Sequence, residues 1–580
     1  MTENTVTSPT EDSSAPILPD ALRLQRTRTE IDQAADEHYR RMLELDPAMA
    51  TIKGHPGHET EYPDYSPAGY AAQITAMRET LQQINQLLPV DAVDRVSVDV
   101  LNERLGLEIE LYEAGLWGWE LNPLATPAHG IRQIFDLMPQ KTPQDWAHIV
   151  GRLENVPAAL EGVIETLEHH REQGRIAAAR QVRLCAEQFT AYAQQGGFFD
   201  DLADQATSSD PALAERAQEA AQAAAAAYQR LSEHLTETLL PQAPQEDAVG
   251  RQRYRLHSRE FLGTAVDLEE TYRWGVQELD QIIAEQEQVA EEISPGASIA
   301  QAKQILTEDP QRILHGTDAL REWMQEVSDR AVEFLAEGHF TIEGPMRTIE
   351  CMIAPTHEGG IYYTPPSADF SRPGRMWWSV PEGENTFTTW GETSTVYHEG
   401  VPGHHLQFAT GAALAESVND YRAHGVWVSG HGEGWALYAE RLMDELGYLS
   451  DPGDRMGMLD GQRMRAARVV FDIGVHCGFE IPSSWAERIG HSGVWTAEAG
   501  HEFLVQNLDL SEGQREFEFH RYLGWPGQAP SYKIGQRVWE QLRAEALERG
   551  ESLKDFHTRA LLVGSVGLDT LRRALQEHTD

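Results

Sequence analysis

The sequence has few basic residues and no segment in which they gather. Its 580 residues include 47 lysines and arginines against 92 aspartates and glutamates, which gives a formal net charge of −45. Only five of the basic residues are lysines: Lys53, Lys141, Lys303, Lys533 and Lys554. Nucleic acids present dense negative charge, and this chain has no basic stripe to meet it, so we expect no nucleic-acid partner.

Cysteines and long apolar runs are also scarce. Cys185, Cys351 and Cys477 lie far apart and form no CxxC pair, which argues against a disulfide framework and against a cysteine-rich metal site. No run reaches the roughly 18 to 20 apolar residues that cross a bilayer. Residues 1–20 contain neither the basic nor the apolar region of a secretory signal. We therefore expect a cytoplasmic protein without a membrane partner.

Helical periodicity covers most of the chain. Hydrophobic residues make up 41% of the sequence, which is enough for a large core. They recur at helical spacing before residue 340 and again from about residue 388 to the end. Between residues 340 and 380, short β-like runs such as GIYYTPP and GRMWWSV alternate with turn residues. The sequence predicts a mainly α fold with one small β-sheet.

The chain divides into three parts by composition. Residues 1–20 are rich in Ser, Thr, Pro and acidic residues, which is typical of a disordered tail. A helical region is predicted over residues 21–245. The turn-rich segment LPQAPQEDAVG, residues 240–250, is the predicted hinge, and residues 246–580 form the predicted catalytic region that contains the sheet.

The most informative segment is YHEGVPGHHLQ, residues 397–407. A His-Glu pair followed by a histidine is similar to the HExxH zinc motif, in which two histidines one helical turn apart bind the ion and the glutamate acts on water. Here position i+4 from His398 is Pro402, which cannot bind a metal. On an ideal helix His404 would lie about 9 Å further along the axis and about 120° around it. His405 would share the face of His398 but would lie about 10.5 Å away.

Pro402 and the flanking glycines could bring His398 and His404 close together by interrupting the helix. Proline interrupts the hydrogen bonds of a helix, and Gly400 and Gly403 tolerate unusual backbone angles. A kink between Gly400 and Gly403 would bring His404 back toward His398. The hypothesis therefore requires an irregular helix at this point.

A third metal ligand is predicted downstream. Glu433 opens an amphipathic helix in the segment HGEGWALYAE, and a carboxylate from a second helix completes a His₂Glu zinc site. Glu440, two turns later, is either a partner of a metal ligand or a surface acid. Three protein ligands would leave one position for water, which is the catalytic arrangement of zinc.

These two segments resemble the bacterial family called domain of unknown function 885, whose hallmark is HExxPGHxxQ followed by EGWAxYxE. The segments SADFSRPGRMWWS, residues 367–379, and WPGQAPSYKIG, residues 525–535, fit the same family. The family is similar to gluzincin-type zinc peptidases such as the thimet-type oligopeptidases and the Taq-type carboxypeptidases. The resemblance implies a large two-lobed helical fold with a deep central channel, one Zn²⁺ ion and peptide hydrolysis. It carries His398, His404 and Glu433 over as metal ligands and Glu399 as the general base.

Further candidates are assigned from chemistry and spacing. A peptidase needs a donor for the oxyanion of its intermediate, and Tyr532 is the first candidate and His476 the second. Asp472, four residues before His476, can orient an imidazole, and His405 is placed beside the ligands rather than among them. The candidates for substrate binding are Arg372, Gln528 and Lys533.

The predicted function is zinc-dependent hydrolysis of short peptides, with an exopeptidase or oligopeptidase action. Two alternatives remain open from the sequence. One is a metal-dependent hydrolase of a non-peptide amide or ester on the same site. The other is an inactive peptidase fold that binds peptides, which the unusual ligand spacing motivates. The sequence leaves the oligomeric state, the substrate sequence and the physiological metal open.

Overall fold

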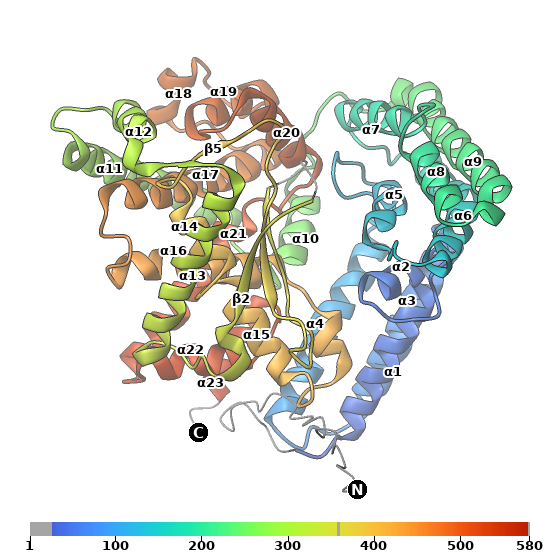
Figure 1. Cartoon of the computed structure of the whole chain (residues 1–580), viewed down its shortest axis with the longest axis horizontal. Helices are drawn as coiled ribbons and strands as arrows, with labels where there is room; N and C mark the ends of the chain where they lie inside the picture. The colour runs from blue at the N-terminus through green and yellow to red at the C-terminus, as the bar shows by residue number, and fades with distance from the viewer. Residues whose placement is uncertain (1–25, 356–359, 578–580) are drawn as a thin grey trace, which may run out of the picture.

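The computed structural model describes residues 26–355 and 360–577, and helices dominate this part of the chain (Figure 1). This confirms the predicted mainly α fold. The predicted tail, residues 1–20, lies outside the described residues. The first nine helices are α1 (Glu30–Leu45), α2 (Pro47–Ile52), α3 (Pro67–Ile84), α4 (Ala92–Glu113), α5 (Pro127–Leu137), α6 (Pro143–Glu172), α7 (Ala179–Tyr192), α8 (Phe198–Ser209) and α9 (Ala214–Glu233).

The helices after the predicted hinge surround two small sheets. None of the described helices is long and apolar enough to cross a membrane. These helices are α10 (Arg251–Leu262), α11 (Leu268–Ile293), α12 (Ile299–Glu308), α13 (Thr317–Gly338), α14 (Thr393–Glu399), α15 (His404–Leu414), α16 (Ser429–Glu445), α17 (Pro452–Cys477), α18 (Ser483–Ile489), α19 (Ala497–Asn507), α20 (Glu512–Gly524), α21 (Ser531–Glu548), α22 (Leu553–Leu562) and α23 (Leu568–Glu577).

Many of the helices begin at a side-chain cap that the sequence supplies. The side chains of Thr29, Ser66 and Thr142 accept hydrogen bonds from backbone N–H groups of the first turn of α1, α3 and α6. Asp451 does the same for α17. Such caps satisfy donors that have no partner inside the helix, so they determine where each helix starts.

The hydrophobic core consists of two clusters. The smaller cluster runs from Trp119 to Ala243 and is built by α5 to α9, which lie together at the upper right of Figure 1. The larger cluster joins all of the chain from α10 onward with α1, α3 and α4, through side chains such as Ile31 and Leu101. The smaller cluster thus ends inside the turn-rich segment 240–250, whereas the first helices of the chain share the core of the later ones.

The strands position the helices that carry the candidate site. β2 (Ile349–Ile353) and β3 (Ile361–Thr364) flank β4 (Gly374–Trp378), parallel and antiparallel to it respectively. This sheet lies within the predicted range of 340–380, and its strands contact α13, α14 and α15. A second pair, β1 (Ile313–His315) and β5 (Thr386–Thr388), is antiparallel and lies outside that range.

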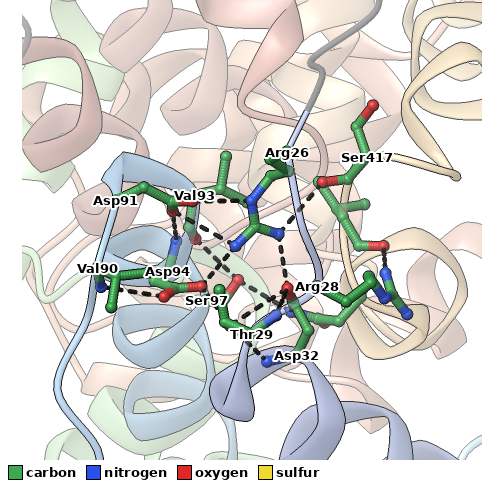
Figure 2. A network of polar contacts seen from close by, with 12 residues as sticks. Arg26, Arg28, Thr29, Asp32, Val90, Asp91, Val93, Asp94, Ser97 and Ser417 are labelled. Carbon is green, nitrogen blue, oxygen red and sulfur yellow. Dashed lines mark hydrogen bonds and ion pairs between the residues drawn. The ribbon is translucent and has the colours of Figure 1, made fainter.

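An arginine near the start of the described chain joins three segments that are distant in sequence (Figure 2). The Arg26 guanidinium donates to Asp32 of α1 at 2.7 Å, to Asp94 of α4 at 2.6 Å and to Asp91 at 2.9 Å. It also reaches the carbonyl of Ser417, in the loop that follows α15, at 3.5 Å. The side chains of Asp32 and Asp94 are fully buried, so this one cation offsets part of the negative charge of two carboxylates inside the protein.

We predict that Arg26→Ala lowers the free energy of unfolding by about 3 kcal/mol, because it leaves buried carboxylates without their cation. Urea-induced unfolding followed by tryptophan fluorescence measures the change. Arg216→Ala is the matched control, since the Arg216 side chain is 53% exposed and pairs with the exposed Glu154. The control should lose less than about 1 kcal/mol. Equal losses in the two variants would contradict the role given to Arg26.

Candidate metal centre

The helix that carries His398 ends directly after Glu399, and a new helix starts at His404. Four residues, Gly400 to Gly403, form a turn between α14 and α15. In this turn the Gly403 N–H donates to the Tyr397 carbonyl at 3.1 Å, and the His405 N–H donates to the Gly400 carbonyl at 3.0 Å. The irregularity that the sequence required between Gly400 and Gly403 is therefore present, and it removes the separation of about 9 Å that a straight helix would impose.

Gly403 is required at this turn because the chain passes very close to itself. A Cβ atom added to Gly403 would lie 1.9 Å from the carbonyl oxygen of His398. The indole N–H of Trp435, on α16, donates to the carbonyl of Pro402 at 2.8 Å and approaches that of Gly403 at 3.2 Å. Trp435 is fully buried, so α16 contacts the turn through this indole, and the same helix carries Glu433.

The turn brings the two predicted imidazoles and the predicted carboxylate together. His398 Nε2 lies 3.4 Å from Glu433 Oε2, and His404 Nε2 lies 3.5 Å from the same oxygen. The two imidazole rings are perpendicular, with their centroids 4.9 Å apart. One carboxylate oxygen from α16 thus lies close to an imidazole nitrogen of α14 and to an imidazole nitrogen of α15.

These separations fit a tetrahedral metal ion better than direct hydrogen bonds. Donors at about 2.0–2.2 Å from a tetrahedral zinc ion lie roughly 3.3–3.6 Å from one another. Ordinary N–H···O hydrogen bonds have donor–acceptor distances of about 2.9–3.0 Å. Two neutral imidazoles and one carboxylate are also a ligand set that zinc favours. On geometry and on donor chemistry, the residues present fit a zinc ion.

The electrostatics of the cluster favour a cation at the same point. Burial alone would lower the pKa of His398, but the carboxylates of Glu433 and Glu440 raise it to about 10. Burial alone would raise the pKa of Glu433, but the two imidazoles hold it well below its usual range. A field that stabilises a proton between these side chains also stabilises a metal ion there, and the two compete for the same donors.

Glu399 is the fourth side chain of the cluster. One donor atom from each of His398, Glu399 and His404 lies within 4.8 Å of the others, so these three side chains form a group that can hold a metal ion. Glu399 is buried, and burial raises its pKa above the usual range for a glutamate. A carboxyl group beside the donors with a raised pKa is suited to accept and return a proton.

The two imidazoles differ in how their second nitrogen is held. His398 Nδ1 lies 2.7 Å from Glu440 Oε1, and Glu440 is buried on the same helix as Glu433. A carboxylate in this place fixes the ring orientation and leaves Nε2 free to bind metal. His404 Nδ1, in contrast, is buried and has no hydrogen-bond partner among the described residues.

His405 is held away from the cluster by two hydrogen bonds. Its Nδ1 lies 2.8 Å from the hydroxyl of Tyr363 on β3, and its Nε2 lies 2.9 Å from the carbonyl of Met346. Burial lowers the pKa of this imidazole to about 4, so it stays neutral near pH 7. Both ring nitrogens are engaged, and His405 anchors α15 to the sheet.

The chain matches the family model described as "Bacterial protein of unknown function (DUF885)" over residues 47–575. The chain belongs to this family. The match confirms the family resemblance that the two motifs indicated, and it runs from the start of α2 into α23. No curated protein matches this DUF885 chain.

Two solved structures share the fold of this DUF885 protein. One is described as "the putative lipoprotein from Colwellia psychrerythraea"; it has a TM-score of 0.80 and 20% identity, with 95% of this chain and 98% of that chain covered. The other is described as "a putative lipoprotein of unknown function from Shewanella oneidensis"; it has a TM-score of 0.73 and 16% identity, with 95% and 100% covered. At these identities the similarity concerns the fold. The descriptions concern those two proteins, and the cytoplasmic location expected for this chain stays a prediction.

Tyr532 lies near the metal centre of this DUF885 protein. It is carried by the first turn of α21, which crosses α16 at such close range that a Cβ on Gly434 would lie 2.5 Å from the backbone of Gly535. Burial, together with the negative charge of Glu433, raises the pKa of Tyr532 to about 12, so its hydroxyl remains a donor. The guanidinium of Arg468 lies 5.2 Å from the centre of its ring.

The structure places His476 and Asp472 in another buried cluster, near the C-terminal end of α17. Asp472 accepts hydrogen bonds from the Tyr254 hydroxyl at 2.7 Å and from the Gly527 N–H at 2.8 Å. His476 Nε2 lies 3.0 Å from the Tyr522 carbonyl. Among the described contacts, none joins His476 or Asp472 to the metal donors, and the two side chains tie α10 and α20 to α17.

Two of the residues predicted to bind substrate already have partners within the protein. Lys533 is buried and donates to Glu278 at 2.8 Å and to Gln462 at 2.5 Å. Gln528 accepts a hydrogen bond from Arg521 at 2.5 Å. Arg372 is exposed in the loop between β3 and β4, close enough to Tyr363 to influence its pKa. Of the three, Arg372 alone is exposed.

Arg465 is a residue near the centre that sequence reasoning missed. Its positive charge lowers the pKa of both Glu399 and Tyr532, and it lies one turn before Arg468 on α17. Spacing along α17 could have shown that Arg465, Arg468 and Asp472 share a face. What that face meets is decided by the crossing of α17 with α14 and α21, which no local pattern reveals.

We predict that Gly403→Ala lowers zinc affinity at least about tenfold, because its Cβ would displace the turn that brings His404 to His398. Gly411→Ala, on the helix α15 that follows the turn, is a matched control, since a Cβ there meets no atom within 4 Å. Zinc content after dialysis against graded chelator, measured by mass spectrometry, gives the comparison. Equal zinc retention in both variants would show that the turn does not depend on Gly403.

Proposed function

We propose that this protein is a zinc-dependent peptidase that hydrolyses short peptides. The observation that carries the proposal is the convergence of His398 Nε2, His404 Nε2 and Glu433 Oε2 at 3.4 and 3.5 Å, with Glu399 buried beside them. In the proposed assignment these three side chains hold the ion and Glu399 is the general base. This ligand set is supported over the set with Glu399 because one Glu433 oxygen lies close to both imidazoles.

When bound, a zinc ion supplies a Lewis acid that polarises a carbonyl group and increases the acidity of water. Glu399 accepts a proton from the attacking water at a carboxylate oxygen and delivers it to the leaving nitrogen. Its raised pKa matches both steps, since the group must first gain the proton and later return it. Glu440 keeps the His398 ring oriented throughout by accepting from Nδ1.

Tyr532 is the proposed donor to the carbonyl oxygen as negative charge develops on it. Its phenol is buried near Glu433 and stays protonated at neutral pH because its pKa is raised to about 12. The nearby guanidinium groups of Arg465 and Arg468 add positive potential on the same side, which favours that charge. We also propose that the protein is similar to gluzincin-type peptidases. In the same proposal, the substrate reaches the centre through a channel between two lobes.

The test compares two glutamates. We expect Glu399→Gln to keep its zinc. Its kcat/KM on a panel of tetrapeptides should fall by about 10²–10⁴-fold, because the general base is removed. Glu433→Gln should instead lower zinc affinity, since an amide is a poorer ligand than a carboxylate. Glu416→Gln, an exposed glutamate after α15, is the control and should behave as the wild type.

The same panel, extended to amides and esters, decides between the alternatives. Cleavage of amides or esters without cleavage of peptides would support the non-peptide hydrolase. Zinc retained with no cleavage of any substrate would support a peptide-binding protein. A Glu399→Gln variant that is as active as the wild type would remove Glu399 from the mechanism.

A further inference from the structure

A small cavity lined by two aromatic rings lies next to the candidate metal centre. Phe408 and Trp427 stack with their ring centroids 5.3 Å apart and an angle of 10°. Each of them also lies close to His404, at 6.1 and 6.3 Å between ring centroids. The same two rings line a cavity of about 80 Å³, so the metal donors and the cavity share this aromatic wall.

Trp427 is placed to contact a ligand that reaches the metal centre. It is 45% exposed, although its indole packs closely against α16, where a Cβ on Gly432 would lie 2.1 Å from the ring. Gly432 precedes Glu433, the proposed third ligand. A large exposed aromatic ring between a cavity and a metal centre is a surface on which an apolar part of a ligand can rest.

Two polar side chains of the cavity, those of Gln407 and Ser565, have no hydrogen-bond partner among the described residues. Gln407, one turn after His404 on α15, is 9% exposed. Both its amide oxygen and its amide nitrogen are buried without a hydrogen-bond partner in the described part of the chain. The hydroxyl of Ser565, in the segment after α22, lines the same cavity and is likewise buried and unpaired among the described residues. Leaving such groups unpaired is costly, so they point to a ligand.

The remaining lining is apolar, with one cation that is already occupied. Leu414 and Val426 contribute aliphatic surface. Arg422 also borders the cavity, but its guanidinium donates to the carbonyls of Val563 at 2.5 Å and Val93 at 3.3 Å. The cavity therefore offers an apolar body with one amide and one hydroxyl at its polar part, which is the usual pattern of a selective small-ligand pocket.

From this arrangement we infer that the cavity is a specificity pocket for a substrate side chain with an aliphatic stem and a neutral amide end, such as glutamine, next to the scissile bond. The inference rests on the proposed peptidase function. A carboxamide complements the Gln407 amide, because its NH₂ donates to the Gln407 oxygen while its oxygen accepts from the Gln407 nitrogen. The cavity is about half the roughly 150 Å³ that holds a benzene ring, which disfavours aromatic side chains.

The experiment measures binding separately from cleavage. Zinc-loaded full-length Glu399→Gln protein is titrated by calorimetry with tetra-alanine peptides in which Gln, Leu, Glu or Phe replaces each position in turn. At one position the Gln peptide should bind about tenfold more tightly than the other three. A second variant, Glu399→Gln with Gln407→Leu, should lose the preference for Gln over Leu and keep its zinc. Gln304→Leu, at an exposed position, is the control and should keep the preference.

Each contrary result overturns the inference in a different way. Tightest binding of the Glu peptide would show that Arg422 selects an anion, and tightest binding of the Phe peptide would show that the aromatic wall alone selects. Loss of zinc in the Gln407→Leu variant would make Gln407 a positioning residue for His404 Nδ1. Equal binding of all peptides would exclude a side-chain pocket. Failure of the peptidase proposal is seen separately, as absence of cleavage by the wild-type zinc protein.

Discussion

The candidate centre depends on one steric constraint, the passage of the backbone at Gly403 against the carbonyl of His398. Only a residue without a side chain permits this approach, because a Cβ would lie 1.9 Å from that oxygen. The approach ends α14 after Glu399 and restarts a helix at His404, so two imidazoles six residues apart in sequence face one point. Trp435 contacts the turn, and its helix, α16, also carries Glu433. One helix therefore positions both the turn and the third donor.

Because the cluster is buried, the charges of its side chains need compensation. Glu399, Glu433 and Glu440 are carboxylates in or beside a buried cluster that contains two metal-donor imidazoles, in a chain whose formal net charge is already −45. Such a cluster is stable only with compensating positive charge, from protons or from a metal ion. Arg465 and Arg468 on α17 add positive charge near Tyr532, and Arg465 also acts on Glu399. The centre thus has an acidic side that suits a cation and a basic side that suits a developing anion.

The helix that carries His404 also links the centre to the rest of the molecule. Its first turn is fixed to the sheet by His405. It also carries Gln407 and Phe408, which line the cavity together with Trp427. The loop that follows α15 is tied to α1 and α4 through the Arg26 network at Ser417 (Figure 2). The early helices of the chain therefore share both the core and the polar contacts of the later, site-bearing region, which explains why the hydrophobic clusters divide inside the predicted N-terminal part.

The mainly α fold, the β-like stretch near residues 340–380, the family and the residue types of the centre could all be predicted from the amino-acid sequence, because periodicity, propensity and short motifs are local properties. The sequence also required the interruption between Gly400 and Gly403, since a straight helix would separate His398 from His404. Three placements depend on the packed structure: Glu433 and Glu440 approach the two ring nitrogens of His398, His476 and Asp472 lie in a different cluster, and Arg465 lies near the centre. These placements follow from how α14, α16, α17 and α21 cross, and crossings are determined by packing between residues far apart in the chain.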